Sequence, residues 1–321
     1  MKSLARPAVL AFLVTFATHA FAQFPSKPIR IVFPYATAGG GGLDAIVRLL
    51  AQEVSVSLKQ PVVVEYRPGA STTIGAAATV SSPPDGHTLF LNAQSFLITA
   101  QLMSRLPYDP KKDLTAVTSL VSNPHVLIVG PKSPYKTARE FFEDAQKKGA
   151  TLSYASFGNA SSGHLGFEGL KKTVGFEMTH IPYKGSEGMN DVMGGRVDTM
   201  FADLPSSIQH AAAGRLVQLA VASAQRDPLV PDVPTISEVT GKPFVSRSWF
   251  GLLVRADTPR DIVMTLNREF IGAMAKPHIA ERIRSYGFQA MPSTPEAFTQ
   301  FMASESVRIS EAIKFSGAKM E

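Results

Sequence analysis

The sequence has no cysteine among its 321 residues. This absence excludes disulfide bonds, thiolate nucleophiles and cysteine-based zinc sites. The sequence also has no run of basic residues, because its lysines and arginines stand singly or in pairs and leave a net charge of only +6. Nucleic-acid binding usually shows as a basic stripe or patch. We therefore expect no nucleic-acid partner.

Metal and nucleotide motifs are missing as well. The seven histidines are never spaced to share a helical or strand face with a nearby carboxylate, so the pattern predicts no metal site. No glycine-rich turn ends in Gly-Lys-Ser or Gly-Lys-Thr, and the third glycine of a dinucleotide fingerprint is replaced by Asp44. We expect neither a metal nor a cofactor.

Long apolar runs are absent after the N-terminus. Lys2 and Arg6 precede an apolar run over residues 8–18, and Ala20-Phe21-Ala22 gives the small-x-small pattern of a signal-peptidase site. The run is too short to span a bilayer, and no cysteine follows for a lipid anchor. Residues 1–22 are thus predicted to be a cleaved signal peptide, with the mature chain in the periplasm.

Short β-branched runs alternate with helical periodicity along the rest of the chain, which is typical of α/β architecture. The predicted strands cover residues 29–33, 61–65, 88–91, 126–129, 151–154, 180–182, 199–201, 217–221 and 249–254. A Pro-rich stretch at residues 227–243 and a shorter one at 122–124 are interpreted as linkers. They divide the chain into lobe 1 (residues 23–123 and 248–321) and lobe 2 (residues 124–247), joined by a hinge of two crossings.

Local signals place several helix starts. Thr137 and Glu140 form a capping-box pattern. Pro259 and Pro295 each follow a threonine, which favours proline at the first helical position. Ser71 or Thr72 is predicted to cap the helix over residues 72–80, with ligand contact as the second reading of these hydroxyls.

The turns rich in Gly, Ser, Thr and Asn carry the candidate chemistry. Residues 34–44 hold four consecutive glycines between a strand and a helix, and residues 156–164 form a similar turn. Such turns lie at the carboxyl ends of parallel strands, where free N–H groups of helix N-termini favour anions. For residues 34–44, a flexible turn without a ligand is an equally good reading.

An enzymatic alternative uses Ser162 and His164, with Asp203 to orient the histidine. No serine of the chain lies in a Gly-x-Ser-x-Gly elbow. Ser162 and His164 are two positions apart, so on a helix their side chains point in different directions. We favour a binding protein over an exported hydrolase and predict no catalytic residues.

In collinear order, many segments resemble the Bug-type extracytoplasmic receptors of tripartite tricarboxylate transport systems. They include Lys27-Pro28-Ile29-Arg30-Ile31-Val32, Arg67-Pro68-Gly69-Ala70, Pro84-Asp85-Gly86-His87-Thr88-Leu89, Leu106-Pro107-Tyr108-Asp109, His180-Ile181-Pro182-Tyr183-Lys184-Gly185-Ser186, Gly194-Gly195-Arg196-Val197-Asp198, Leu204-Pro205-Ser206, Pro231-Asp232-Val233-Pro234-Thr235 and Trp249-Phe250-Gly251. The resemblance covers essentially the whole predicted mature chain.

The resemblance implies a two-lobed periplasmic-binding-protein fold of type II character, closing on a small-molecule carboxylate. It implies as partners the membrane components of a tripartite tricarboxylate transporter, with a membrane sensor kinase as the alternative, and we expect a monomer. By resemblance the ligand-binding residues are Thr37, Ala38, Gly39, Gly40, Gln94, Ser95, Ser156, Asn159 and Asp203.

Two departures from the family pattern concern these residues. The glycine-rich turn between Pro34 and Asp44 is longer than the family pattern. Ala202-Asp203 stands where the family often has Asp-Asn before Leu-Pro-Ser. The solute therefore does not follow from the resemblance.

Overall fold

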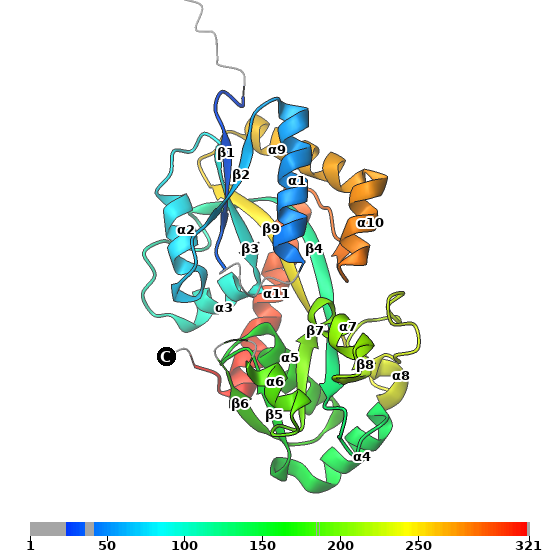
Figure 1. Ribbon diagram of the computed structural model, residues 1–321. Coiled ribbons are helices and arrows are strands. Elements are labelled where there is room, and N and C mark those ends of the chain that lie inside the picture. Colours follow the sequence, from blue (N-terminus) through cyan, green and yellow to red (C-terminus); the bar gives the residue numbers. More distant parts are fainter. Residues whose placement is uncertain (1–23, 36–41, 184, 186, 320–321) are drawn as a thin grey trace, which may run out of the picture.

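The computed structural model describes residues 24–35, 42–183, 185 and 187–319. The predicted signal peptide lies outside the described residues. The described chain forms two α/β lobes, one above the other, and each lobe has a sheet flanked by helices, as predicted (Figure 1). No helix in the described ranges has the length and apolar character needed to span a membrane.

Lobe 1 is built on the strand order β2-β1-β3-β9-β4. β1 is parallel to β2 and β3, while β9 runs antiparallel to β3 and β4, and β10 pairs with β4. The strands span β1 (Ile29–Phe33), β2 (Val62–Tyr66), β3 (Thr88–Ala93), β4 (Leu114–Val129), β9 (Arg247–Arg255) and β10 (Gln289–Ala290).

The two faces of this sheet are covered by helices from both ends of the chain. Buried apolar residues pack one face against α1 (Leu43–Leu58), α9 (Arg260–Ala275) and α10 (Pro277–Ser285). The other face packs against α2 (Thr73–Val80), α3 (Gln94–Leu102) and α11 (Pro295–Ser316). The short 3-10 turn η2 (Ala70–Thr72) precedes α2.

Lobe 2 uses the second half of β4, which pairs with β7 (Thr199–Asp203) and β8 (Val217–Val221). β5 (Ser153–Ser156) and β6 (Thr179–Pro182) extend the sheet in parallel. One face packs against α4 (Ala138–Lys148), α5 (Ser162–Val174) and α8 (Ile236–Thr240), with η3 (Gly149–Thr151) after α4. The other packs against α6 (Glu187–Met193) and α7 (Leu204–Ala212).

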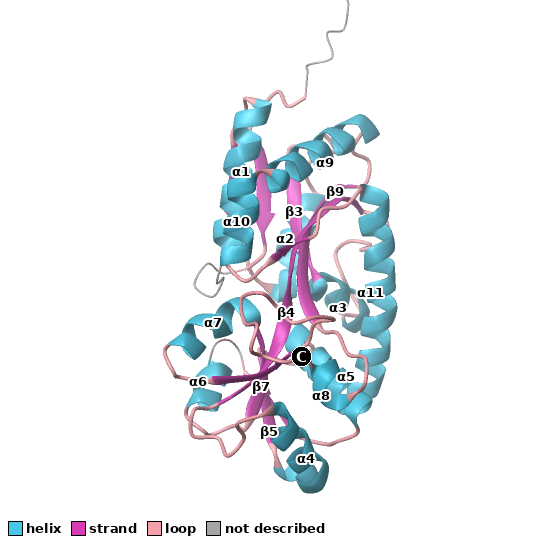
Figure 2. Cartoon of the chain, turned by 90° about the vertical axis from the view of Figure 1, so that its right-hand side faces the viewer, coloured by secondary structure: helices cyan, strands magenta, loops and turns pink. Residues whose placement is uncertain are grey.

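The predicted linker at residues 122–124 is wrong, because these residues lie inside β4. Ser122, Asn123 and Pro124 pair with Trp249, Ser248 and Arg247 of β9. Ser122 and Asn123 are buried although polar, and the Asn123 amide donates to Asp203. Polar residues of this kind are typical of loops. Here their strand and hydrogen-bond partners allow the single strand β4 to continue from lobe 1 into lobe 2 (Figure 2).

The Pro-rich stretch at residues 227–243 is likewise not a free linker. It contains α8, which begins with a capping box between Thr235 and Glu238, and the Asp227 side chain is buried. Glu238 also pairs with Arg226. The chain returns to lobe 1 only after this stretch, through residues 244–247 into β9. That residues 123/124 and 247/248 bound two independently moving lobes stays a prediction.

A third element, α11, also joins the lobes (Figure 2). It packs on α3 and β4 and, further along, on α5 of lobe 2. Ile98 of α3, Leu165 of α5 and Ile309 of α11 share one buried apolar cluster. The lobes are therefore packed together beside the strand crossings, which the sequence did not indicate.

Predicted helix starts were correct in part. The Thr137 capping box is present, and Pro295 is the first residue of α11. Pro259 instead precedes α9 as its N-cap residue. Thr72 stands at the N-cap of α2, but its side chain makes no capping hydrogen bond because its backbone is left-handed, at a φ of 79°. The predicted capping by Ser71 or Thr72 is therefore wrong.

Candidate functional site

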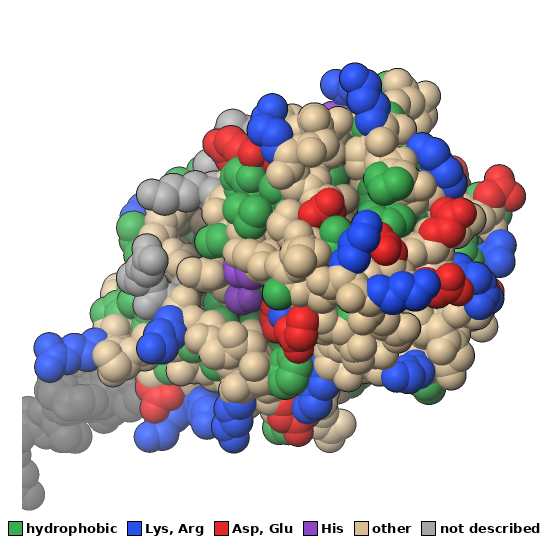
Figure 3. Space-filling model, turned by 90° about the horizontal axis from the view of Figure 1, so that it is seen from below, with side chains coloured by type: hydrophobic (Ala, Val, Ile, Leu, Met, Phe, Trp, Pro, Cys, Tyr) green, Lys and Arg blue, Asp and Glu red, His purple; other side chains and the backbone are tan. Residues whose placement is uncertain are grey.

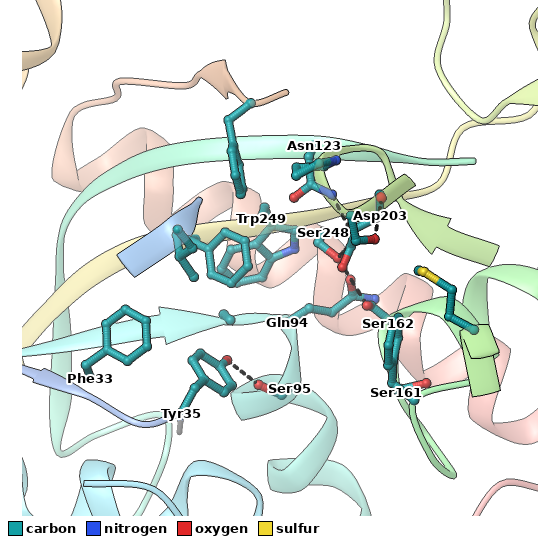
Figure 4. Close-up of a pocket in the computed structure, with 18 of the residues that line it drawn as sticks. Phe33, Tyr35, Gln94, Ser95, Asn123, Ser161, Ser162, Asp203, Ser248 and Trp249 are labelled. Atoms are coloured by element: carbon teal, nitrogen blue, oxygen red, sulfur yellow. Dashed lines mark hydrogen bonds between the residues drawn. The ribbon is translucent and has the colours of Figure 1, made fainter. Parts of the chain in front are cut away.

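A cleft of about 510 Å³ lies between the lobes, and residues of both lobes line it. Lobe 1 contributes the ends of β1 and β3 with the first residues of α1 and α3. Lobe 2 contributes the turn before α5, the end of β7 and the start of α7. Asn123 and Ser248, from the crossing strands β4 and β9, form the floor. Figure 4 shows these groups facing one another.

Four helices start at this cleft. Leu43 of α1, Gln94 of α3, Ser162 of α5 and Pro205 of α7 all line it, and each lies in the first turn of its helix. The first N–H groups of a helix have no partner within the helix, and the macrodipole makes this end positive. These helix starts therefore favour negative charge in the cleft.

The lobe 1 wall carries a pair of hydroxyls. Tyr35 and Ser95 lie 2.8 Å apart, oxygen to oxygen. Burial raises the pKa of Tyr35 to about 12, with the bond to Ser95 opposing, so this phenol keeps its proton at physiological pH. One of the two hydroxyl protons is used between them. The other is available to an acceptor in the cleft.

Gln94 is next to Ser95, and two arginine residues fix its side chain. With its amide oriented to suit its neighbours, it donates to the Arg247 carbonyl and accepts from Arg308, each at 3.2 Å. Arg308 in turn pairs with Glu305 of α11 at 2.8 Å. The bridging helix thus fixes the side chain at the start of α3. Gln94 lines the cleft in this orientation.

The lobe 2 wall carries a carboxylate, Asp203. Its Oδ1 accepts from Asn123 Nδ2 at 2.7 Å and from the Ser248 hydroxyl at 2.8 Å. The same Ser248 hydroxyl lies 3.1 Å from Ser162 at the start of α5. His125 lies behind, with Nε2 3.7 Å from Oδ1. Burial lowers the pKa of His125, although Asp203 opposes this, so the imidazole is neutral at physiological pH.

The predicted site residues fall into three groups. Gln94, Ser95 and Asp203 line the cleft together. Thr37, Ala38, Gly39 and Gly40 lie outside the described residues. Ser156 and Asn159 are not among the lining residues. The Ser156 hydroxyl bonds to His180 and the Gly158 carbonyl, while Asn159 is exposed. For all nine, contact with a ligand stays a prediction.

The enzymatic pair does not form in the described structure. Ser162 bonds to Ser248, whereas His164 Nδ1 accepts the Ala160 N–H at 2.9 Å and its ring stacks on His180. Burial lowers the pKa of His164 to about 4. His164 therefore does not contact the hydroxyl it would have to activate.

Sequence reasoning missed the apolar part of the cleft. Tyr35, Phe157 and Phe250 are partly exposed and line it, and Phe33 and Trp249 lie behind them as buried lining residues. Their separation in the chain concealed the cluster. The Trp249-Phe250-Gly251 segment was the only signal, and it was noted as a family motif rather than as part of a wall.

The charges of the lining are few. Among the described residues that line the cleft, none is lysine or arginine, and the titratable side chains are Tyr35, Asp203 and His210. No group of three metal-ligating residues was found in the described part of the chain. On the outer surface, basic and acidic side chains are interspersed on the face seen in Figure 3.

Comparisons with known proteins show the family to which the chain belongs. Residues 46–317 match the family described as "Tripartite tricarboxylate transporter family receptor". Protein BugT of Bordetella pertussis is 31% identical over 301 residues, which cover 93% of this chain and 92% of BugT. A protein from the tcbD-tcbE intergenic region of a Pseudomonas strain is 34% identical over 89% of this chain and 85% of its own length.

Solved structures show the same fold. An R. palustris protein with adipate superposes with a TM-score of 0.82 at 29% identity, over 92% of this chain and 99% of that one. The periplasmic binding protein BugD gives 0.78 at 28%, over 93% and 100%. MatC from Rhodopseudomonas palustris with bound malate gives 0.76 at 28%, over 90% and 100%. The predicted two-lobed periplasmic-binding-protein fold is confirmed.

Proposed function

This chain belongs to the tripartite tricarboxylate transporter receptor family, and from that premise we propose that it is a periplasmic receptor that captures a small carboxylate. The resemblance to Bug-type receptors read from the sequence is confirmed by the family match and by BugT and BugD. The capture of a carboxylate is supported by the relatives described with adipate and malate.

The observation that carries the proposal is the convergence of four helix starts on a cleft whose described lining has no lysine or arginine. Backbone N–H groups and neutral hydroxyls hold a carboxylate by hydrogen bonds and by the helix dipoles. They leave its charge less tightly paired than a bidentate arginine would. Such binding suits a receptor that must release its solute again.

Delivery to the membrane components of a tripartite tricarboxylate transporter is part of the proposal, and the family description supports it. Export through a signal peptide ending near Ala22 is supported by the Lys2 and Arg6 n-region and the apolar run that follows. We propose a monomeric receptor that returns its ligand unchanged, since Ser162 and His164 are not bonded to each other.

The test is a thermal-shift screen of the mature protein against mono-, di- and tricarboxylates, followed by calorimetry of the hits. A ligand at 100 times its dissociation constant adds about 2.7 kcal/mol of stability. We expect at least one carboxylate to raise the melting temperature and to be recovered unchanged by mass spectrometry. The proposal is contradicted if no carboxylate raises the melting temperature, or if the protein converts its ligand into a product.

A second measurement tests the location. Mass spectrometry of the periplasmic fraction should give a mature N-terminus at or near Gln23. Recovery of the protein with Met1 intact and confined to the membrane fraction would exclude a processed periplasmic receptor.

A further inference from the structure

Asp203 gives the cleft one fixed negative charge. Its side chain is 35% exposed and lines the cleft. Both of its protein hydrogen bonds, from Asn123 and Ser248, go to Oδ1. Within the described residues, Oδ2 accepts no hydrogen bond. An ionised carboxylate with one oxygen unused has strong remaining acceptor capacity and nothing to donate.

No cation in the described lining compensates this charge. Among the described residues, His125 lies 3.7 Å from Asp203, but it is buried and approaches the already bonded Oδ1. Asp203 stands at the N-cap of α7, and Ser248 links it to Ser162 at the start of α5. The Asp203 side chain makes no capping hydrogen bond to α7, but its negative charge lies beside the helix starts of lobe 2. The helix starts of lobe 1, at α1 and α3, have no acidic side chain among the described lining residues, so they are the better place for a ligand carboxylate.

This arrangement discriminates among carboxylates. A ligand carboxylate at the lobe 1 helix starts puts the rest of the molecule near Asp203. A second carboxylate there would meet a like charge, with no lysine or arginine of the described lining to compensate it, which is unfavourable in a partly dehydrated cleft. A hydroxyl, amino or amide N–H would instead form a charge-assisted hydrogen bond to Oδ2.

The body of the ligand meets aromatic rings. Tyr35 and Phe250 come from lobe 1 and Phe157 from lobe 2, and all three are partly exposed at the cleft. Aromatic side chains of both lobes suit a flat ring between them, since offset and edge-to-face contacts add to the burial of apolar area. A flexible aliphatic chain gains less and loses more conformational entropy.

We infer that the solute is an aromatic monocarboxylate bearing a hydrogen-bond donor, whose carboxylate binds the lobe 1 wall and whose donor binds Asp203. This inference rests on the proposed function and specifies its ligand. Asp203 is the residue that determines specificity, because it accepts the donor and repels a second carboxylate.

The experiment compares matched ligands by calorimetry: 3- and 4-hydroxybenzoate, the corresponding methoxybenzoates, benzene-1,4-dicarboxylate and adipate. The methoxy compounds keep the ring and its oxygen but have no donor. We expect the better hydroxybenzoate to bind about tenfold or more tightly than its methoxy partner, since a hydrogen bond to a charged group is lost. The dicarboxylate and adipate should bind more weakly than that hydroxybenzoate by a similar factor.

The variant Asp203→Asn keeps the shape and removes the charge. We expect it to gain about tenfold for benzene-1,4-dicarboxylate and to lose most of the hydroxyl preference. The control Asp232→Asn removes the same charge from an exposed lobe 2 position outside the cleft and should leave both ratios unchanged. Melting temperatures of the ligand-free variants report any purely structural role of Asp203.

The ligand ratios of the unmodified protein decide the matter even if Asp203→Asn does not fold. Equal binding of hydroxy and methoxy partners, or tighter binding of either dicarboxylate, overturns the inference while leaving carboxylate capture intact. The inference is also overturned if a folded Asp203→Asn protein has the same relative affinities for these ligands. Asp203 would then only stabilise the strand crossing. Failure to bind any carboxylate refutes the proposed function itself.

Discussion

The two walls of the cleft are both built from strand ends and helix starts, but their side chains have opposite effects on a ligand carboxylate. In each lobe, strands end at the cleft and helices begin there, so both walls present N–H groups and positive helix ends. The lobe 1 wall adds the neutral Tyr35–Ser95 pair. The lobe 2 wall adds the carboxylate of Asp203, which lines the cleft at the N-cap of α7 without capping it. A helix start is therefore a good anion site only where no acidic side chain of the protein lies beside it.

The largest effect is expected when an acidic residue is placed on the lobe 1 wall, because the two walls then both carry a carboxylate. Ser95→Asp puts a carboxylate in the first turn of α3, where an acidic residue is favourable to the helix. We expect the fold to survive and carboxylate affinity to fall by about a hundredfold or more, because the new charge takes the place intended for the ligand.

Calorimetry of Ser95→Asp beside Ser95→Asn separates charge from shape. The asparagine variant keeps most of the size and should lose far less affinity. Equal losses in the two variants would mean that the lobe 1 wall is not where the ligand carboxylate binds.

A second prediction concerns two histidines that support the lobe 2 wall. Behind the turn before α5, the rings of His164 and His180 stack with centroids 3.8 Å apart. Burial lowers the pKa of both to about 4, below the value of about 6.5 in an unfolded chain. The unfolded chain therefore binds more protons between these values, and the stabilisation present above pH 6.5 is lost as the pH falls toward 4.

Allowing for screening at the partly exposed His180, we expect the pair to lower the free energy of unfolding by about 2 kcal/mol between pH 6.5 and 4. Urea unfolding at several pH values measures this loss. His180→Gln, which cannot take up a proton, should reduce the slope in that interval, while the contribution of His164 remains. The same slope in the variant would place the acid sensitivity elsewhere.

The smallest expected effect tests whether the walls approach each other. Gly287 of lobe 1 has a φ of +81°, and an added Cβ would lie 3.2 Å from Cα of Pro205 in lobe 2. Gly287→Ala should hold this end of the cleft apart and weaken ligand binding by about tenfold. Gly214→Ala is the matched control, because Gly214 has a similar φ of +67° and no atoms within 4 Å of the added Cβ.

Both glycine variants should lose about 1 kcal/mol of stability from the left-handed backbone. Only Gly287→Ala should change affinity and raise the radius of gyration of the ligand-bound protein in small-angle scattering. Matching affinities for the two variants would show that contact near Pro205 plays no part in binding.

Periodicity was enough to predict most of the fold. β1 and β8 coincide with the predicted ranges, and most other strands overlap them, because apolar runs of this length are buried between helices. The long strand β4 was predicted only over its last part, residues 126–129. Ser122 and Asn123 look like loop residues, and only tertiary partners such as Asp203 and β9 make them strand residues.

The candidate site could be approached from the sequence at single positions, but not where side chains meet across the lobes. Gln94 and Ser95 were named from the resemblance, and in the structure they follow β3 and open α3. The three aromatic residues Tyr35, Phe157 and Phe250 come from distant parts of the chain. No local signal specifies that they face one cleft. Asp203 was named from the resemblance, but its anchoring to Asn123 and Ser248 depends on the strand crossing.

The continuous strand β4 affects the fraction of ligand-free molecules that have the shape competent to bind. Two lobes tethered by flexible loops would sample many relative orientations, and apparent affinity falls with the fraction of molecules that are competent to bind. Here a hydrogen-bonded strand pair and the helix α11 both run through the junction. We expect these elements to restrict relative movement of the lobes mainly to twisting and bending of the sheet. A ligand would then have less order to impose when it binds, and its affinity would be higher without any additional contact.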